Sequence, residues 1–110
     1  MFHLWHQRHD GLGGHVFLLE DQMRDVREEL VRQGMVCGAE GGRGIPLHKL
    51  ETPENWFVSP IELDEALEQA SREPTRMSDA KLWEDFLDFL AGAAEHGGLR
   101  VHRAQRIGQG

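Results

Sequence analysis

Three regularly spaced histidines near the N-terminus are the residues that come closest to a recognisable chemical site. His3, His6 and His9 form the pattern H-x-x-H-x-x-H. A zinc site needs three or four such ligands that converge on one tetrahedral point. The surrounding residues alternate loosely enough for an exposed strand, which would place His6 on the face opposite His3 and His9. The pattern therefore predicts no metal site, although His48 or His102 could complete a ligand set after folding.

Candidates for covalent catalysis are few. Cys37 is the one cysteine, and its apolar neighbours in sequence are typical of an inert, packed thiol. The serines are Ser59, Ser71 and Ser78, and none lies in the G-x-S-x-G pattern of a nucleophile elbow. Two of them, Ser59 and Ser78, are interpreted as helix caps. The sequence therefore predicts no catalytic residue and favours a protein that is not an enzyme.

Two glycine-rich segments were candidates for phosphate binding. The segment 10–15 lacks the full G-x-G-x-x-G spacing and is not followed directly by a helix. The segment 38–44 lacks the Lys-Ser/Thr pair of a phosphate-binding loop, and Glu40 would repel phosphate. Both segments are interpreted as chain reversals, so no cofactor is predicted.

The carboxylates are numerous and follow the polar faces of two predicted helices. One set is Glu62, Glu65 and Glu68, and the other is Glu84, Asp85 and Asp88. Solvated helix faces are the first interpretation, and an acidic surface that docks a basic partner is the alternative. Trp5 leaves two interpretations open, because it is either an anchor that contacts a partner or a side chain packed under the third helix.

Hydrophobic periodicity predicts the elements that would position these side chains. Apolar residues recur at three- and four-residue spacings over 20–33, 60–73 and 79–96, which predicts three helices. Ser59, Pro60 and Glu62 form a capping box at the start of the second helix, and Ser78 is the predicted N-cap of the third. Shorter extended segments, bounded by turn residues, predict strands at 2–9, 15–18, 35–37, 45–50, 56–58 and 99–102.

The resulting order is β-β-α-β-β-β-α-α-β. Most connections between strands are too short for parallel crossovers, so antiparallel pairing is favoured. The sequence predicts the α+β class: a small, mainly antiparallel sheet of short strands with three helices packed on one side. It predicts a single domain over residues 1–102 and a flexible C-terminal tail over 103–110, and it leaves the strand order open.

Composition narrows the classes of function. The chain has 110 residues with a formal net charge of −7, which argues against the clustered basic face of a nucleic-acid-binding protein. No run approaches the roughly 20 apolar residues of a membrane span, and the start lacks the order of a signal peptide. A single cysteine suits a reducing compartment. We therefore expect a cytoplasmic protein that binds neither nucleic acid nor membranes.

The function expected from the sequence is a non-enzymatic protein–protein interaction module of the adaptor, inhibitor or immunity type. Its expected partner is another protein, and the charge of −7 makes a basic protein a candidate. The alternative is a small metal- or ligand-binding protein that uses the N-terminal histidines. A third hypothesis is a structural subunit that forms a homodimer by pairing exposed strand edges.

Overall fold

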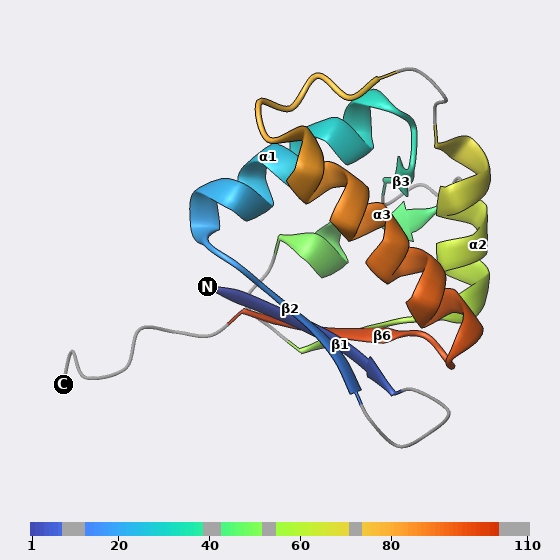
Figure 1. Ribbon diagram of the computed structural model, residues 1–110. Coiled ribbons are helices and arrows are strands. Elements are labelled where there is room, and N and C mark those ends of the chain that lie inside the picture. Colours follow the sequence, from blue (N-terminus) through green and yellow to red (C-terminus); the bar gives the residue numbers. More distant parts are fainter. Residues whose placement is uncertain (8–12, 39–42, 52–54, 71–73, 104–110) are drawn as a thin grey trace, which may run out of the picture.

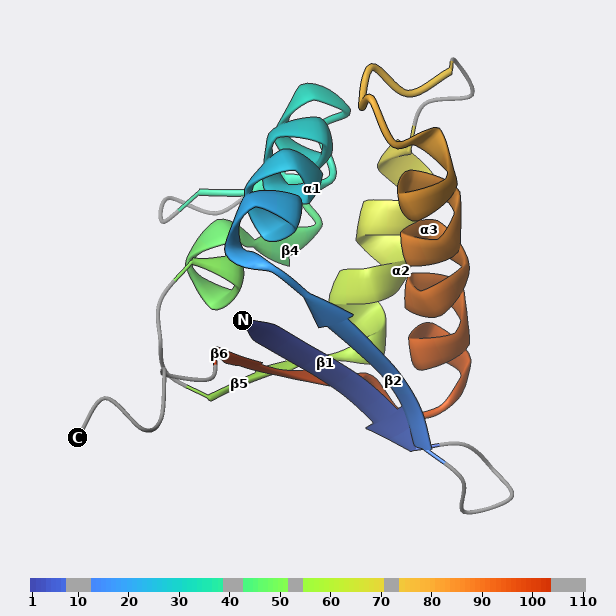
Figure 2. The same ribbon diagram turned by 60° about the vertical axis from the view of Figure 1, so that its left-hand side comes forward.

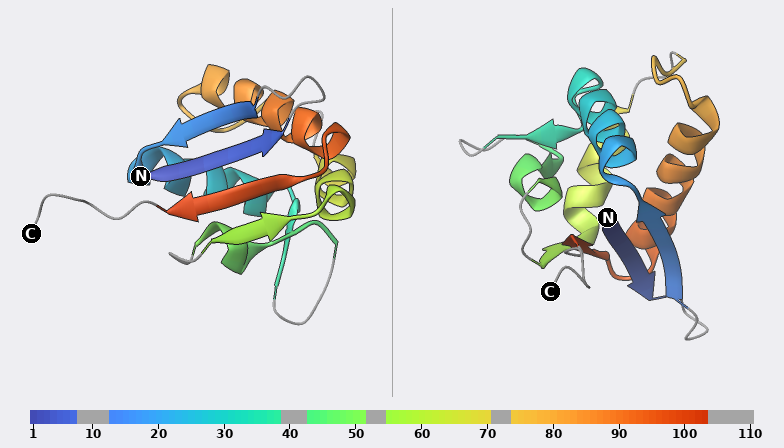
Figure 3. Two further views of the ribbon diagram at one scale, coloured as in Figure 1. Left: turned by 90° about the horizontal axis from the view of Figure 1, so that it is seen from below. Right: turned by 90° about the vertical axis from the view of Figure 1, so that its left-hand side faces the viewer.

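Four strands form one antiparallel sheet, and three helices cover one of its faces (Figures 1 and 2). The computed structural model describes residues 1–7, 13–38, 43–51, 55–70 and 74–103. The strands are β1 (Phe2–Gln7), β2 (Gly13–Leu18), β5 (Trp56–Val58) and β6 (Leu99–Arg103), in the order β2-β1-β6-β5. The helices are α1 (Glu20–Arg32), α2 (Pro60–Gln69) and α3 (Ala80–Glu95). No described helix covers the other face of the sheet, which Figure 3 shows from below.

This architecture confirms the predicted α+β class, the antiparallel sheet and the order of the elements along the chain. The strand order, which the sequence left open, brings the C-terminal strand β6 into the sheet between β1 and β5. The last described residue, Arg103, belongs to β6, so this strand is one residue longer than predicted. Residues 104–110, the rest of the predicted tail, lie outside the described residues.

The core lies between the sheet and the helices. Alternate strand residues point inward, so Phe2 and Leu4 of β1 are buried against the helical layer, as the predicted strand required. The helices bury apolar side chains against the sheet. Leu19 is the N-cap of α1 and is 53% exposed, so the buried stripe of this helix begins at Met23. The other buried apolar side chains of the α-helices are Val26, Leu30, Leu63, Ala66, Trp83, Phe86, Leu90 and Ala93.

Helix α2 begins at the predicted capping box. The amide of Glu62 donates to the Ser59 hydroxyl at 3.2 Å, and the amide of Ser59 donates to the Glu62 carboxylate at 2.9 Å. Pro60 occupies the first helical position, where the amide hydrogen that it lacks would have no partner in the helix. Val58 and Leu63, on either side of this cap, are both buried and occupy the positions of a hydrophobic staple.

The N-cap of α3 is Asp79 and not the predicted Ser78. The Asp79 carboxylate accepts a hydrogen bond from the Leu82 amide at 3.0 Å, and the helix begins at Ala80. A charged cap also interacts favourably with the partial positive charge of a helix N-terminus. Ser and Asp are about equally good caps, so the sequence alone could not choose between these neighbouring residues.

We expect the variant Asp79→Ala to lower the free energy of unfolding by about 1 kcal/mol, since it removes this cap. The matched control Ser78→Ala changes an exposed neighbour and should stay within about 0.5 kcal/mol of the unmodified protein. Urea denaturation of both variants measures the difference. A larger loss of stability for Ser78→Ala than for Asp79→Ala would show that Ser78, which the sequence favoured, is the N-cap.

Two local predictions are wrong in the segment between α1 and α2. The short strands β3 (Val36–Cys37) and β4 (Ile45–Pro46) pair in parallel as a separate two-stranded sheet. This pairing needs Gly44, whose φ is +116° and where a Cβ atom would lie 2.2 Å from the Met35 carbonyl oxygen. Residues 47–50 form a 3₁₀ helix, η1 (Leu47–Leu50), and do not continue the strand. Pro46 restricts its own φ and offers no amide hydrogen, which favours ending a strand there.

Candidate functional site

The N-terminal histidines do not converge on one point. His3 is half-buried on the side of the sheet that faces away from the helices. His6 is 7% exposed on the opposite side, where its ring lies 5.1 Å from that of Phe89 on α3. This confirms that the strand separates His3 from His6, while His9 lies outside the described residues. Within the described part of the chain, no group of three or more His, Cys, Asp or Glu side chains could hold a metal ion.

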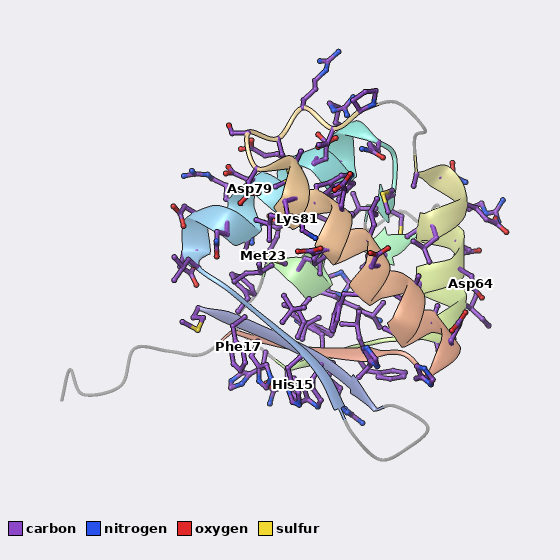
Figure 4. All side chains as sticks on the ribbon, in the orientation of Figure 1. His15, Phe17, Met23, Asp64, Asp79 and Lys81 are labelled. Carbon is purple, nitrogen blue, oxygen red and sulfur yellow. The ribbon has the colours of Figure 1, made fainter. Side chains whose placement is uncertain are left out.

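The uncovered side of the sheet carries a continuous set of aromatic, histidine and arginine side chains, which we call the open face. The strand register places them in two rows across the sheet. The first row is Phe17, His3 and His102, and the second row is His15, Trp5, Arg100 and Phe57. Figure 4 shows His15 and Phe17 projecting from β2 away from the helices. Trp5 is thus on the open face, so the interpretation that it packs under α3 is wrong.

His3 lies at the centre of a stack of rings on this face. Its ring centroid is 4.3 Å from that of Phe17 and 4.5 Å from that of Trp5, and the ring planes differ by 6° and 27°. The His15 ring is also nearly parallel to it, at 5.1 Å and 14°. Because aromatic side chains have few rotatable bonds, such a stack forms a comparatively rigid surface.

A hydrogen bond of 2.8 Å joins His3 Nε2 to His15 Nδ1. It requires one of these nitrogens to lack a proton, so the pair cannot keep it when both rings are charged. Burial lowers the pKa of His3, and the nearby His15 and His102 lower it further because each would repel a second positive charge. The His3 side chain on the open face is therefore uncharged near neutral pH.

Charge is distributed unevenly between the two sides of the molecule. None of the described strand residues is Asp or Glu, and the described carboxylates lie on the helices and their flanking turns. The chain has a net charge of −7, yet the described open face carries Arg100 and histidines and no carboxylate. A surface of this kind attracts anionic groups locally, in contrast to the helical side.

Two aromatic rings of the open face are strongly exposed. Phe17 is 60% exposed and Phe57 is 42% exposed. They lie on the two edge strands of the sheet, β2 and β5, with the half-buried rings of His3 and Trp5 on β1 between them. Phe17 and Phe57 therefore lie outside the buried core.

A pocket of about 250 Å³ lies at one end of the open face. Trp5, Phe57 and Arg100 form its outer part, and His6 and His96 form its inner part. The two histidine rings are parallel, with centroids 5.8 Å apart. The pocket thus joins the open face to the end of α3, and no carboxylate lines it.

Of the two acidic sets considered from the sequence, the set on α2 is used largely within the chain, whereas Glu84, Asp85 and Asp88 on α3 are exposed. Glu62 is half-buried and accepts hydrogen bonds from Lys49 at 3.0 and 3.1 Å. Glu65 and Glu68 both pair with Arg43, at 3.6 and 2.7 Å. These carboxylates fasten α2 to the preceding segment, so they are less available to a basic partner than the sequence suggested.

Cys37 and Ser59 have structural contacts and no catalytic geometry. The Cys37 thiol is half-buried and donates to the Gly44 carbonyl oxygen at 3.6 Å. Ser59 is occupied by the cap of α2. The glycine segment 10–15 and the segment 38–44 lie partly outside the described residues. No described helix has the length and apolar character needed to span a bilayer.

Sequence reasoning missed most of the open face, namely His15, Phe17, Phe57 and Arg100. A signal was present: in 15–18 and 99–102 the apolar positions alternate with His, Phe or Arg, where a solvated strand usually carries small polar residues. With helices on one side of the sheet, all these alternate positions must share the other side. His96 gave no comparable signal, because it is the last residue of the predicted third helix and stands beside two glycines.

Comparisons with known proteins give no relative from which a role for these residues could be carried over. The sequence matches no family model, and no match is found among curated proteins or among solved structures. The arrangement itself offers flat rings, one permanent cation and titratable imidazoles on a firm sheet. These groups can stack on other rings, pair with an anion and exchange hydrogen bonds.

Proposed function

We propose that this protein is an interaction module that binds another protein through the open face of its sheet. The observation that carries this proposal is the continuous uncovered surface formed by the ring stack around His3 and by the exposed Phe17 and Phe57. An antiparallel sheet needs one covered face for its core, and its second face normally carries polar side chains toward water. Aromatic and arginine side chains are instead the types enriched where proteins bind tightly.

The charge of the open face favours an acidic partner surface. Arg100 and the histidines face outward there, and the described face has no carboxylate that would repel an acidic chain. This reverses the expectation from net charge, which had suggested a basic partner. A second copy of the chain, paired through the same face, would bring two Arg100 cations together, which opposes symmetric pairing. Nucleic acid would meet one permanent cation on the described face and a net charge of −7 on the whole chain.

The test compares the variants Phe17→Ser and Ile61→Ser as baits in affinity capture from the native host lysate. Both remove an exposed apolar side chain, but Phe17 lies on the open face and Ile61, 71% exposed, lies on α2. We expect a protein that the unmodified chain and Ile61→Ser retain and that Phe17→Ser loses. Purified, that protein should bind Phe17→Ser about 30-fold more weakly by calorimetry, the effect typical of an interface hot spot.

The same experiment can overturn the proposal. Equal retention by both variants would show that the open face is not the interface. Retention of nucleic acid in place of protein would show that nucleic acid, and not an acidic protein, is the partner. A stable homodimer in light scattering that Phe17→Ser disrupts would show that the partner is a second copy of the chain. Binding that strengthens with added salt would contradict the expected charge complementarity, because salt screens attraction between exposed charges.

A further inference from the structure

The pocket at the end of the open face has the composition of an anion site with flat apolar walls. Arg100 stands directly between Trp5 and Phe57 in the strand register, with one ring on each neighbouring strand. Its guanidinium carbon lies 5.4 Å from the centroid of the Phe57 ring. This contact holds the cation over a ring face while its N–H groups stay able to donate elsewhere.

The positive charge of Arg100 is not neutralised within the described chain. Arg43, by contrast, pairs with the two carboxylates Glu65 and Glu68, whereas Arg100 forms no ion pair with any described residue. His6 and His96 add ring nitrogens to the same pocket, and His6 is buried beneath it. Every ionisable side chain that lines the pocket is therefore an arginine or a histidine.

Glycine keeps the pocket open at the turn between α3 and β6. Gly97 and Gly98 both have positive φ, +90° and +96°, and both line the pocket. A Cβ atom on Gly98 would lie 2.8 Å from the Phe57 ring and 2.5 Å from the Val58 carbonyl oxygen. The Phe57 ring thus packs directly on the backbone at this turn, which fixes one wall of the pocket.

The size of the pocket limits what enters it. Its volume of about 250 Å³ is below the roughly 300–1,000 Å³ of pockets for drug-sized ligands. It suits a single ring or one amino-acid side chain. Guanidinium groups bind carboxylates in a planar, two-point geometry, and aromatic walls favour a flat apolar group beside the charge.

We infer that this pocket binds a carboxylate carried on one aromatic ring or one aromatic residue, with Arg100 as the anion-binding group and Trp5 and Phe57 as the walls. Two sources present this chemistry: a free small aromatic acid, and the C-terminal carboxylate of a partner chain that ends in an aromatic residue. For the second source the inference rests on the proposed function, since the partner would lie along the open face.

In the experiment, each of three probes is titrated into the full chain, and binding is monitored in ¹H–¹⁵N NMR spectra. N-acetylphenylalanine represents a chain terminus, its amide is the neutral counterpart, and benzoate represents a free aromatic acid. We expect saturable shifts at Gly97, Gly98 and Arg100 with a dissociation constant on the order of 1 mM for N-acetylphenylalanine. The amide should bind about tenfold more weakly, because it lacks the charge that Arg100 recognises. The relative affinity of benzoate then identifies which source the pocket prefers.

Matched variants test the role of Arg100. Arg100→Gln should weaken binding of N-acetylphenylalanine about tenfold, whereas Arg24→Gln, which changes an exposed arginine on α1, should leave it unchanged. Spectra that remain dispersed show that each variant is folded. Equal affinity for the acid and the amide, shifts centred on Phe17 instead of the pocket, or no saturation by about 10 mM would each overturn the inference.

Failure of the inference and failure of the proposed function can be told apart. Phe17 does not line the pocket, so Phe17→Ser should retain binding of N-acetylphenylalanine even where it abolishes protein docking. If the acid binds and no protein docks, the pocket is a ligand site and the proposed protein interface is wrong. If a protein docks and the acid does not bind, the open face is a protein interface and the proposed ligand site is wrong.

Discussion

The variant Glu29→Gln is expected to lower the free energy of unfolding by about 3 kcal/mol at pH 7. Glu29 is 3% exposed on α1, and it is held by several donors at once. Arg32 donates to Oε1 at 2.9 Å and also bonds to Oε2, and the Gln33 amide group donates to Oε2 at 2.7 Å. The backbone amide of Arg76 adds a contact at 3.4 Å. Glutamine loses the charge and cannot accept from all of these donors.

The same contacts make the effect depend on pH. Hydrogen bonding from Arg32, with smaller contributions from Gln33, Thr75 and Arg76, lowers the pKa of Glu29 from 4.5 to about 2 despite its burial. A carboxyl whose pKa is lower in the folded state binds its proton more weakly there, so folding gains stability at pH values above the unfolded pKa. This contribution is complete above about pH 5 and is lost as the pH falls through 4 toward 2.

Urea denaturation at pH 7 and at pH 3 measures this prediction. The difference between the unmodified protein and Glu29→Gln should shrink to less than half at pH 3, because the unmodified protein then loses the same stabilisation. The control is Glu28→Gln, one residue earlier on the same helix and exposed, with an expected change within about 0.5 kcal/mol at either pH. A loss in Glu29→Gln that is the same at both pH values would point to lost packing and not to the charge.

Glu29 also shows where prediction from the sequence ends. The stripe of Met23, Val26 and Leu30 was predictable, because apolar periodicity is local to the helix. Burial of Glu29 depends on a backbone amide 47 residues away in the chain, at Arg76. No pattern within α1 reports such a contact, so a carboxylate beside the stripe is reasonably assigned to solvent.

The candidate site likewise has some features that were predictable from the sequence and others that were not. Alternation along β1 correctly separated His3 from His6, since it depends only on the geometry of one strand. The pairing of Trp5 with Arg100, and of Arg100 with Phe57, depends on β6 lying between β1 and β5. Strand order is set by packing of the whole chain, so alternation within single strands could indicate which residues face outward but not their arrangement across the sheet.

The turn that forms one wall of the pocket gives the second large prediction. Gly98→Ala is expected to lower the free energy of unfolding by about 3–4 kcal/mol, from backbone strain and from overpacking. Its φ of +96° disfavours any side chain, and the added Cβ would lie 2.5 Å from the carbonyl oxygen of Val58. That oxygen belongs to β5 beside β6, so the clash is relieved only by moving a strand of the sheet.

Gly97→Ala separates the two causes, because Gly97 has nearly the same backbone conformation without the clash. Its φ is +90°, and nothing lies within 4 Å of the position of an added Cβ. Only backbone strain remains, so the expected loss is about 1–2 kcal/mol. Denaturation curves of the two variants give the contribution of packing as their difference, about 2 kcal/mol. Equal losses would mean that Phe57 and Val58 move aside without cost. The Phe57 side chain would then be mobile, and the shape of the pocket would depend on the bound ligand more than on the turn.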